Sequence, residues 1–107
     1  MLLSVHSFTP RYHGVARPWH AGVIHRHDRA LGEDLLASLR AEPALCIGDN
    51  QPYGPHEGAF HSMQRHAEAR GLRGAMFEVR QDLLEDEDGL DRWAASLQRA
   101  IASALGS

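Results

Sequence analysis

The sequence predicts an α/β fold with a largely parallel sheet. Short apolar runs alternate along the 107 residues with segments whose leucines recur at helical spacing, and proline, glycine or asparagine separates them. Apolar residues make up 43% of the chain, which is typical of a packed domain and not of a disordered segment. We therefore interpret residues 1–107 as belonging to one domain.

Four strands are expected. The first, Leu2–Phe8, ends at Thr9, because the residue before Pro10 is extended and proline cannot continue a ladder. A loop that contains Gly14 and Pro18 follows. The remaining strands are residues 19–25, the apolar run 44–48, which we expect to be buried on both faces, and Gly74–Arg80.

Three helices lie between or after these strands. Asp28 is a suitable N-cap for the first, which carries a leucine stripe and ends before Pro43. The second is expected from a cap at Ser62 to Gly71, after an aperiodic loop over residues 49–61. The third spans residues 90–105. Its predicted apolar stripe consists of Leu90, Trp93, Leu97, Ile101 and Leu105.

Composition excludes several classes of function. The net charge of −3 gives no general attraction to nucleic acid or to an anionic membrane, and no apolar stretch is long enough to span a bilayer. The N-terminus lacks the pattern of a signal peptide, so a cytoplasmic location is expected. A single cysteine and the absence of lysine exclude internal disulfides, multi-cysteine zinc sites and Schiff-base catalysis.

Glu78 is the carboxylate with the most unusual setting. Alternation along its strand places it on the face shared with Met76 and Arg80, between the apolar residues Phe77 and Val79. Its charge is unfavourable there unless a partner stabilises it or a raised pKa is used. The carboxyl end of a strand is also where open α/β sheets bind ligands. Two interpretations stay open: a catalytic carboxylate, or an internal ion pair with an arginine.

Histidines offer two candidate metal sites. His6 lies near the corresponding end of its own strand, where it is either a polar contact or one metal ligand. Catalytic zinc needs three protein ligands, and spacing does not identify the other two. A rival cluster of His25 and His27, with His20 and Asp28 nearby, is better explained as solvated surface.

Other notable side chains have ordinary explanations beside functional ones. Arg17 and Arg80 suit carboxylate recognition because guanidinium is a planar, two-pronged donor, yet with 11 arginines either is equally a surface charge. Trp19 and Tyr53 are packing residues by default. Cys46 lies in an apolar run and is expected to be a core residue.

Five motifs taken together resemble the N-formylglutamate amidohydrolase family, over residues 5–105. Each motif is modest alone, and their order and spacing make the resemblance specific. The family's reaction releases formate from N-formyl-L-glutamate with a bound metal, a step of histidine degradation. The motifs are His-Ser-Phe-Thr-Pro, Arg-Pro-Trp, Gly-Asp-Asn-Gln-Pro-Tyr, Arg-His-Ala-Glu-Ala-Arg-Gly-Leu and Glu-Val-Arg-Gln-Asp-Leu.

The resemblance implies a three-layer α/β/α fold around a mostly parallel or mixed sheet, like the C-terminal half of a zinc exopeptidase. It also implies a Zn²⁺ cofactor with His6 as one ligand. Glu78 would be the general base that takes a proton from water. The implied contacts to the N-acyl amino acid substrate are Arg17 and Arg80 for its carboxylates, and Asn50 and Tyr53 for the pocket wall.

Two departures from the family pattern bear on activity. Gln51 stands where the family's Asn-Glu-Pro-Tyr motif has glutamate, and the metal ligands of the family's N-terminal half are not among these residues. We therefore expect a partial, truncated domain that lacks its N-terminal half, tends to self-associate and has negligible activity alone. The alternative is a non-catalytic remnant that binds a small anion or a partner chain.

Overall fold

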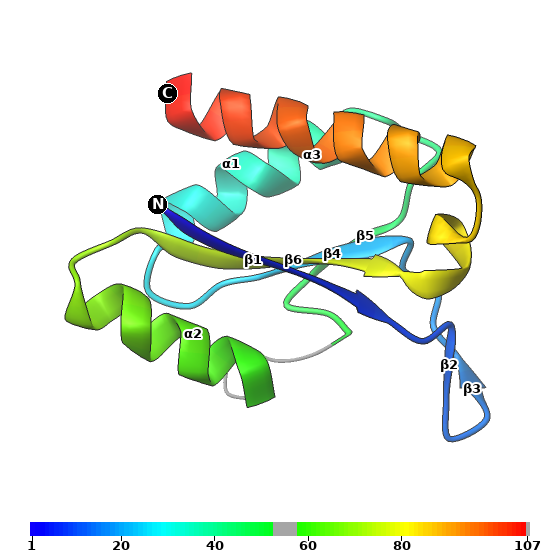
Figure 1. Ribbon diagram of the computed structural model, residues 1–107, viewed down its shortest axis with the longest axis horizontal. Coiled ribbons are helices and arrows are strands. Elements are labelled where there is room, and N and C mark those ends of the chain that lie inside the picture. The colour runs from blue at the N-terminus through cyan, green and yellow to red at the C-terminus, as the bar shows by residue number, and fades with distance from the viewer. Residues whose placement is uncertain (53–57, 107) are drawn as a thin grey trace.

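Three layers make up the computed structural model of this protein (Figure 1). Helices α1 (Arg29–Leu39) and α3 (Glu87–Gly106) cover one face of a sheet, and helix α2 (Gly58–Ala69) lies on the other. The structure describes residues 1–52 and 58–106, and only the backbone of residues 58–63. The predicted α/β/α architecture is confirmed. In these parts of the chain no helix has the length and apolarity needed to cross a bilayer.

The main sheet is mixed. Its strand order is β1 (Leu2–Phe8), β6 (Gly74–Arg80), β4 (Ala21–Ile24) and β5 (Ile47–Asp49). β1 runs parallel to β6 and β4 runs parallel to β5, whereas β4 and β6 are antiparallel. β6 therefore has a neighbour on each side and helices above and below, and its residues are buried up to Val79.

The segment between β1 and β4, expected to be a loop, contains a small hairpin. β2 (Arg11–Tyr12) pairs with β3 (Val15–Ala16) across His13 and Gly14, whose φ angles are 51° and 78°. Two left-handed residues between antiparallel strands form the tight turn for which glycine is favoured. The hairpin extends away from the three layers near the carboxyl end of β1 (Figure 1).

α1 begins where the sequence predicts. Asp28 Oδ1 accepts a hydrogen bond from the Leu31 N–H at 2.9 Å, which satisfies one donor of the first helical turn. Arg73 donates to the same carboxylate at 2.8 and 3.3 Å and thereby lowers the pKa of Asp28. This pair ties the start of α1 to the chain before β6. The predicted leucine stripe is buried, and it consists of Leu31, Leu35, Leu36 and Leu39.

We expect Asp28→Ala to lower the free energy of unfolding by about 1 kcal/mol through loss of the cap. Asp28→Asn is the matched control, because it keeps a capping oxygen and loses only the half-exposed ion pair with Arg73. Because the pKa of Asp28 is lowered in the folded protein, its carboxylate stabilises the fold fully above the ordinary pKa of 3.8. This stabilisation is lost as pH falls through the lower pKa of the folded state. Urea unfolding at neutral and acid pH measures the loss of stability in each variant and its dependence on pH. Equal losses in the two variants would assign the effect to the ion pair.

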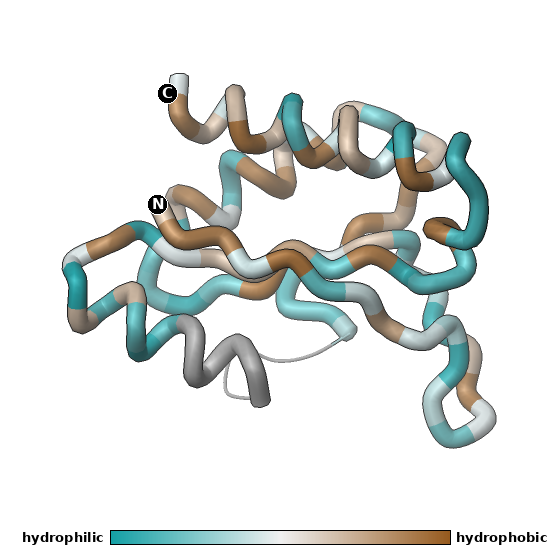
Figure 2. The backbone as a smooth tube through the Cα atoms, in the orientation of Figure 1, coloured by the Kyte–Doolittle hydropathy of each residue, from teal (hydrophilic) through white to brown (hydrophobic). Residues whose placement is uncertain are grey.

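α3 buries a different face from the predicted stripe. Leu90 and Leu105 are 50% and 65% exposed, so the prediction is wrong at both ends. Residues four apart advance by about 400° around a helix, so a stripe at that spacing rotates roughly 40° per step away from the core. Figure 2 shows the apolar side of α3 turned towards α1 and the sheet. The buried residues are Trp93, Ser96, Ala100 and Ala104.

Two further element boundaries differ from prediction. α2 begins at Gly58, so Ser62 lies inside this helix and is not its cap. β5 begins only at Ile47, and Cys46 before it is exposed. The main chain of Cys46 is held by His20, whose Nδ1 accepts from the Cys46 N–H at 2.8 Å. The prediction of a core cysteine is therefore wrong, because the apolar run starts before the paired strand does.

Candidate active site

One row of residues across the sheet places the two predicted catalytic residues side by side. His6 on β1 is the register partner of Glu78 on β6. The partner of Glu78 on β4 is Gly22, whose own partner on β5 is Gly48. Paired residues of neighbouring strands present their side chains to the same face. His6 and Glu78 therefore share one face of the sheet. The other two positions of the row, Gly22 and Gly48, have no side chains.

This row faces the layer of α2. Phe77 packs against Trp93 of α3, with ring centroids 6.3 Å apart, so alternation turns Glu78 to the opposite side. Figure 1 shows the carboxyl ends of β1 and β6 extending past α2 towards the β2–β3 hairpin. The hydrolase interpretation requires an imidazole and a carboxylate on the same side of the sheet, and the register places His6 and Glu78 there.

Glu78 is buried, and one of its two carboxylate oxygens has no hydrogen-bonding partner. It is 4% exposed, and its Oε2 has no partner. No ion pair to Glu78 occurs in the described parts of the chain, which disfavours the internal ion pair considered from the sequence. Burial raises the pKa of Glu78 to about 7, although the charge of Arg17 opposes the increase. A carboxyl group with a pKa near neutrality is suited to general-base catalysis.

His6 is exposed on the outer strand of the sheet. Its Nε2 is 2.9 Å from Ser4 Oγ, the next side chain along the same face. The imidazole is thus accessible from solvent while Glu78 beside it is not. Among the residues described here, no three histidine, cysteine or acidic side chains are grouped so as to hold a metal ion. His6 therefore belongs to no such group in the described part of the chain.

Two glycines allow the main chain of Gln51 to cross this row. A Cβ on Gly22 would lie 1.9 Å from the Gln51 carbonyl oxygen, and a Cβ on Gly48 would lie 2.7 Å from Gln51 Cβ. Any side chain at either position would displace the loop that follows β5. Sequence reasoning missed both residues, although glycine inside a strand pattern is the signal for such a close approach.

Arg17 is anchored beside the carboxyl end of β1. It is 9% exposed, and its guanidinium carbon lies 5.6 Å from the Phe8 ring centroid and 4.8 Å from that of Tyr12. Nη1 donates to the carbonyl and hydroxyl oxygens of Thr9 at 3.2 and 3.3 Å. This cation is held close enough to Glu78 to affect its ionisation.

Arg80 is engaged by its own surroundings. Nε and Nη2 donate to the carboxylate of Asp82 at 2.7 and 3.2 Å, and Nη1 donates to the carbonyls of Arg17 and Trp19 at 3.3 and 3.4 Å. Four of its five N–H groups are therefore used within the chain. Arg80 holds the strand ends together and does not present an open fork to a substrate.

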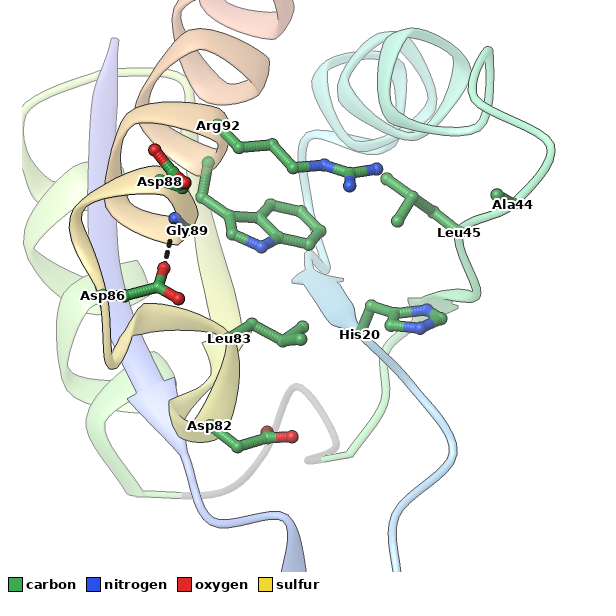
Figure 3. Close-up of a pocket in the computed structure, with 10 residues that line it drawn as sticks. His20, Ala44, Leu45, Asp82, Leu83, Asp86, Asp88, Gly89 and Arg92 are labelled. Atoms are coloured by element: carbon green, nitrogen blue, oxygen red, sulfur yellow. Dashed lines mark hydrogen bonds between the residues drawn. The ribbon is translucent and has the colours of Figure 1, made fainter.

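Asp82 was not singled out from the sequence, although it follows Arg80 by only two residues. The Arg80 guanidinium holds the pKa of Asp82 below its usual range. Figure 3 shows Asp82 and His20 lining a pocket of about 450 Å³ between η1 (Gln81–Leu84) and the start of β4. Trp93 of α3 also lines this pocket. The pocket therefore lies on the α3 side of the sheet, away from Glu78.

Asn50 and Tyr53 were expected in the pocket wall. Asn50 has a φ of 58°, and its Oδ1 accepts from the His25 N–H at 2.8 Å while its own N–H donates to the Val23 carbonyl at 2.8 Å. Asn50 thereby fastens the loop to the end of β4. Tyr53 lies outside the described residues.

The rival histidines have separate partners. His25 is 8% exposed, its Nε2 lies 2.7 Å from Asp49 Oδ1, and its ring packs so closely on α1 that a Cβ at Gly32 would lie 2.4 Å from it. The expectation of solvated surface is therefore wrong for His25, because α1 covers it. His27 pairs with Glu68 of α2.

Comparison with protein families places the chain in a family. A family model described as N-formylglutamate amidohydrolase matches residues 1–85. This chain belongs to the N-formylglutamate amidohydrolase family. All five motifs that carry the predicted resemblance begin and end within the matched residues. Membership of the N-formylglutamate amidohydrolase family suggests an amidohydrolase-type activity.

A solved structure supports the same fold. The crystal structure of gene product Atu2144 from Agrobacterium tumefaciens is 36% identical to this chain and superposes with a TM-score of 0.85 over 97% of it. The match covers 42% of the Agrobacterium chain, so this N-formylglutamate amidohydrolase family member spans less than half the length of that relative. A comparison with curated proteins gives no match.

Proposed function

We propose that this chain carries the general base and one metal ligand of a site that hydrolyses the formyl amide of an amino acid. N-Formyl-L-glutamate is the reference substrate, with formate and L-glutamate as products. The observation that carries the proposal is the register pairing of His6 with Glu78, a buried residue whose carboxylate has one oxygen without a hydrogen-bonding partner. Burial of Glu78 disfavours its charge and so does not serve stability, whereas a base needs that raised pKa.

Glu78 moves the proton in this mechanism. With a pKa of about 7, its ionised form is well populated at neutral pH. The carboxylate takes a proton from water as the water oxygen attacks the formyl carbon. The neutral carboxyl group then gives that proton to the amide nitrogen as the carbon–nitrogen bond breaks, which releases formate and the free amino group. The low exposure of Glu78 keeps bulk water from competing for the proton.

The residues of the row fit a zinc ion in part. His6 offers an accessible imidazole next to a carboxylate, and both are donors that Zn²⁺ prefers. When bound, such an ion polarises the formyl carbonyl as a Lewis acid. The described residues contain no complete donor set. We propose that the remaining ligands come from outside the described residues.

We assign the substrate carboxylate to Arg17. The positive charge of Arg17 lowers the pKa of Glu78 and so opposes the effect of burial. The guanidinium group is held in position by contacts with Phe8, Tyr12 and Thr9. Arg80 and Asn50 act in this proposal as positioning residues, because their polar atoms hold the ends of β4 and β6. A planar guanidinium at a fixed position suits recognition of a carboxylate.

Zinc binding by the purified protein tests the metal assignment. We expect His6→Ala to weaken zinc affinity by about tenfold or more, since loss of even a supporting contact to a ligand costs 10–100-fold. His13→Ala is the matched control, an exposed imidazole on the β2–β3 hairpin. Competition with a zinc-sensitive dye gives both affinities. Equal affinities in the two variants would remove His6 from the metal site.

Formate release tests the reaction. We expect zinc-dependent release from N-formyl-L-glutamate when the unmatched part of the related Agrobacterium chain is supplied, and little release without it. Release that survives removal of zinc by a chelator would contradict the mechanism. Zinc binding at His6 with no release under any of these conditions would favour the alternative, a non-catalytic domain that binds a small anion or a partner chain.

A further inference from the structure

A pocket of about 530 Å³ opens next to the row that carries Glu78. Its walls come from the β2–β3 hairpin, the segment that leads into β4, and Pro52 after β5. Cavities of roughly 300–1,000 Å³ are the size that small-molecule ligands occupy. The pocket therefore has room for a substituent much larger than a formyl group.

The wall of this pocket is largely apolar. Tyr12, Val15, Trp19 and Pro52 contribute aromatic or aliphatic surface to it. Tyr12 and Val15 are 57% and 67% exposed, so the hairpin holds apolar surface open to solvent. Exposed apolar surface gathered around a cavity is typical of a binding site. Arg17 is the one permanently charged side chain among the described residues of the wall.

The pocket adjoins the catalytic row at two points. Arg17 belongs to the wall, and its charge acts on Glu78. Pro52 also belongs to the wall, and the carbonyl oxygen of Gln51 just before it lies over Gly22, the β4 partner of Glu78. The pocket and the row are therefore neighbours, with Arg17 and the segment of Gln51 and Pro52 between them.

N-Formyl-L-glutamate is poorly matched to this wall. Its two carboxylates need two cationic partners, and Arg80, the second arginine expected to bind them, is not in the wall and is bonded to Asp82. An ionised carboxylate without a cation is costly to bury. An aromatic or aliphatic side chain gains free energy there in proportion to the apolar area that it buries.

We propose that the site prefers N-formyl derivatives of amino acids with aromatic or aliphatic side chains over N-formyl-L-glutamate. Arg17 takes the α-carboxylate that all such substrates share, and the pocket takes the side chain. The inference rests on the proposed function for placing the reacting amide at Glu78, and it narrows the class of substrate.

Calorimetric titration of the purified protein with N-formyl-L-phenylalanine and N-formyl-L-glutamate tests the preference without requiring turnover. We expect N-formyl-L-phenylalanine to bind at least about tenfold more tightly, the discrimination that a small difference in apolar fit supplies. Val15→Asp should abolish this preference. Leu105→Asp is the matched control, because Leu105 is 65% exposed and lies at the far end of α3.

Each outcome decides the matter. The preference would be overturned by equal affinities for the two ligands or by tighter binding of N-formyl-L-glutamate. It would also be overturned if neither ligand saturated the protein, or if both aspartate variants had the same effect. The proposed function fails separately. Tight, Val15-dependent binding of the phenylalanine derivative without zinc-dependent formate release would leave the pocket assignment intact and remove the hydrolase assignment.

Discussion

Replacing Glu78 by glutamine is expected to stabilise the protein at alkaline pH by about 3 kcal/mol, at 1.36 kcal/mol for each unit of pKa shift. Burial raises the pKa of this carboxyl group from 4.5 to about 7, so the folded protein favours the neutral form. Its contribution to stability is complete below the ordinary value of 4.5 and is lost as pH rises through about 7. Glutamine has nearly the same shape and no charge to bury.

Urea unfolding across this pH range measures the effect. The unfolding free energy of the wild type should fall between acid and alkaline pH, and that of Glu78→Gln should not show this fall. Glu85→Gln is the matched control, since Glu85 is exposed and a surface substitution typically changes stability by less than about 0.5 kcal/mol. Parallel pH profiles for the wild type and Glu78→Gln would show that this carboxyl group titrates normally.

The same variant should lose turnover. In any preparation in which the wild type releases formate, we expect Glu78→Gln to be about 10²–10⁴-fold slower, the usual contribution of general acid–base catalysis. Zinc content should be nearly unchanged, because His6 is still present. Higher stability together with lost activity is the pattern expected of a residue kept for chemistry at the expense of the fold. Equal loss of zinc and activity would instead make Glu78 a metal ligand.

Gly22→Ala is expected to have the second large effect on stability. The added Cβ would lie 1.9 Å from the Gln51 carbonyl oxygen, and both atoms belong to main chains that cannot simply rotate away. Overpacking of this kind typically costs about 1–3 kcal/mol, occasionally more. The displaced segment crosses the row of His6 and Glu78, so ligand binding should weaken as well.

Chemical denaturation and zinc titration of Gly22→Ala check these two effects. Gly106→Ala is the matched control, because an added Cβ there meets no atom within 4 Å. The control should be as stable as the wild type or slightly more stable, since alanine is the better helix former. Wild-type stability in Gly22→Ala would mean that the loop after β5 is not held against the sheet.

Local chemistry made much of the fold predictable. The Asp28 cap, the leucine stripe of α1 and the apolar strand around Glu78 depend on residues close together in the sequence. The sequence also predicts that His6 and Glu78 open into one crevice, since both lie near strand ends. Their direct pairing between β1 and β6 was not predictable, because it joins strands that lie far apart in the sequence through contacts that no local pattern encodes.

The surroundings of some side chains could not be predicted from the sequence, because they depend on neighbouring elements. Arg80 matches the expected carboxylate clamp in type and place, yet Asp82 and two carbonyl groups use its donors. Leu105 matches a helical stripe, but it is 65% exposed, since no element among the described residues covers its side of α3. His25 resembles a surface residue until α1 packs over it. For Arg80 and His25 the partner lies on a turn or helix whose position is set by packing.

The alignment of β1 with β6 decides whether the candidate site exists at all. A slip of β1 by one residue would turn His6 to the side of α3 and bring Val5 or Ser7 beside Glu78. Leu3 packs against the core at one end of β1, and Phe8 is 2% exposed at the other. Leu3 and Phe8 take no part in the proposed hydrolysis, yet their burial keeps the His6 imidazole on the same face as Glu78. A polar replacement of either residue would weaken the register of β1 against β6 without changing any proposed catalytic group.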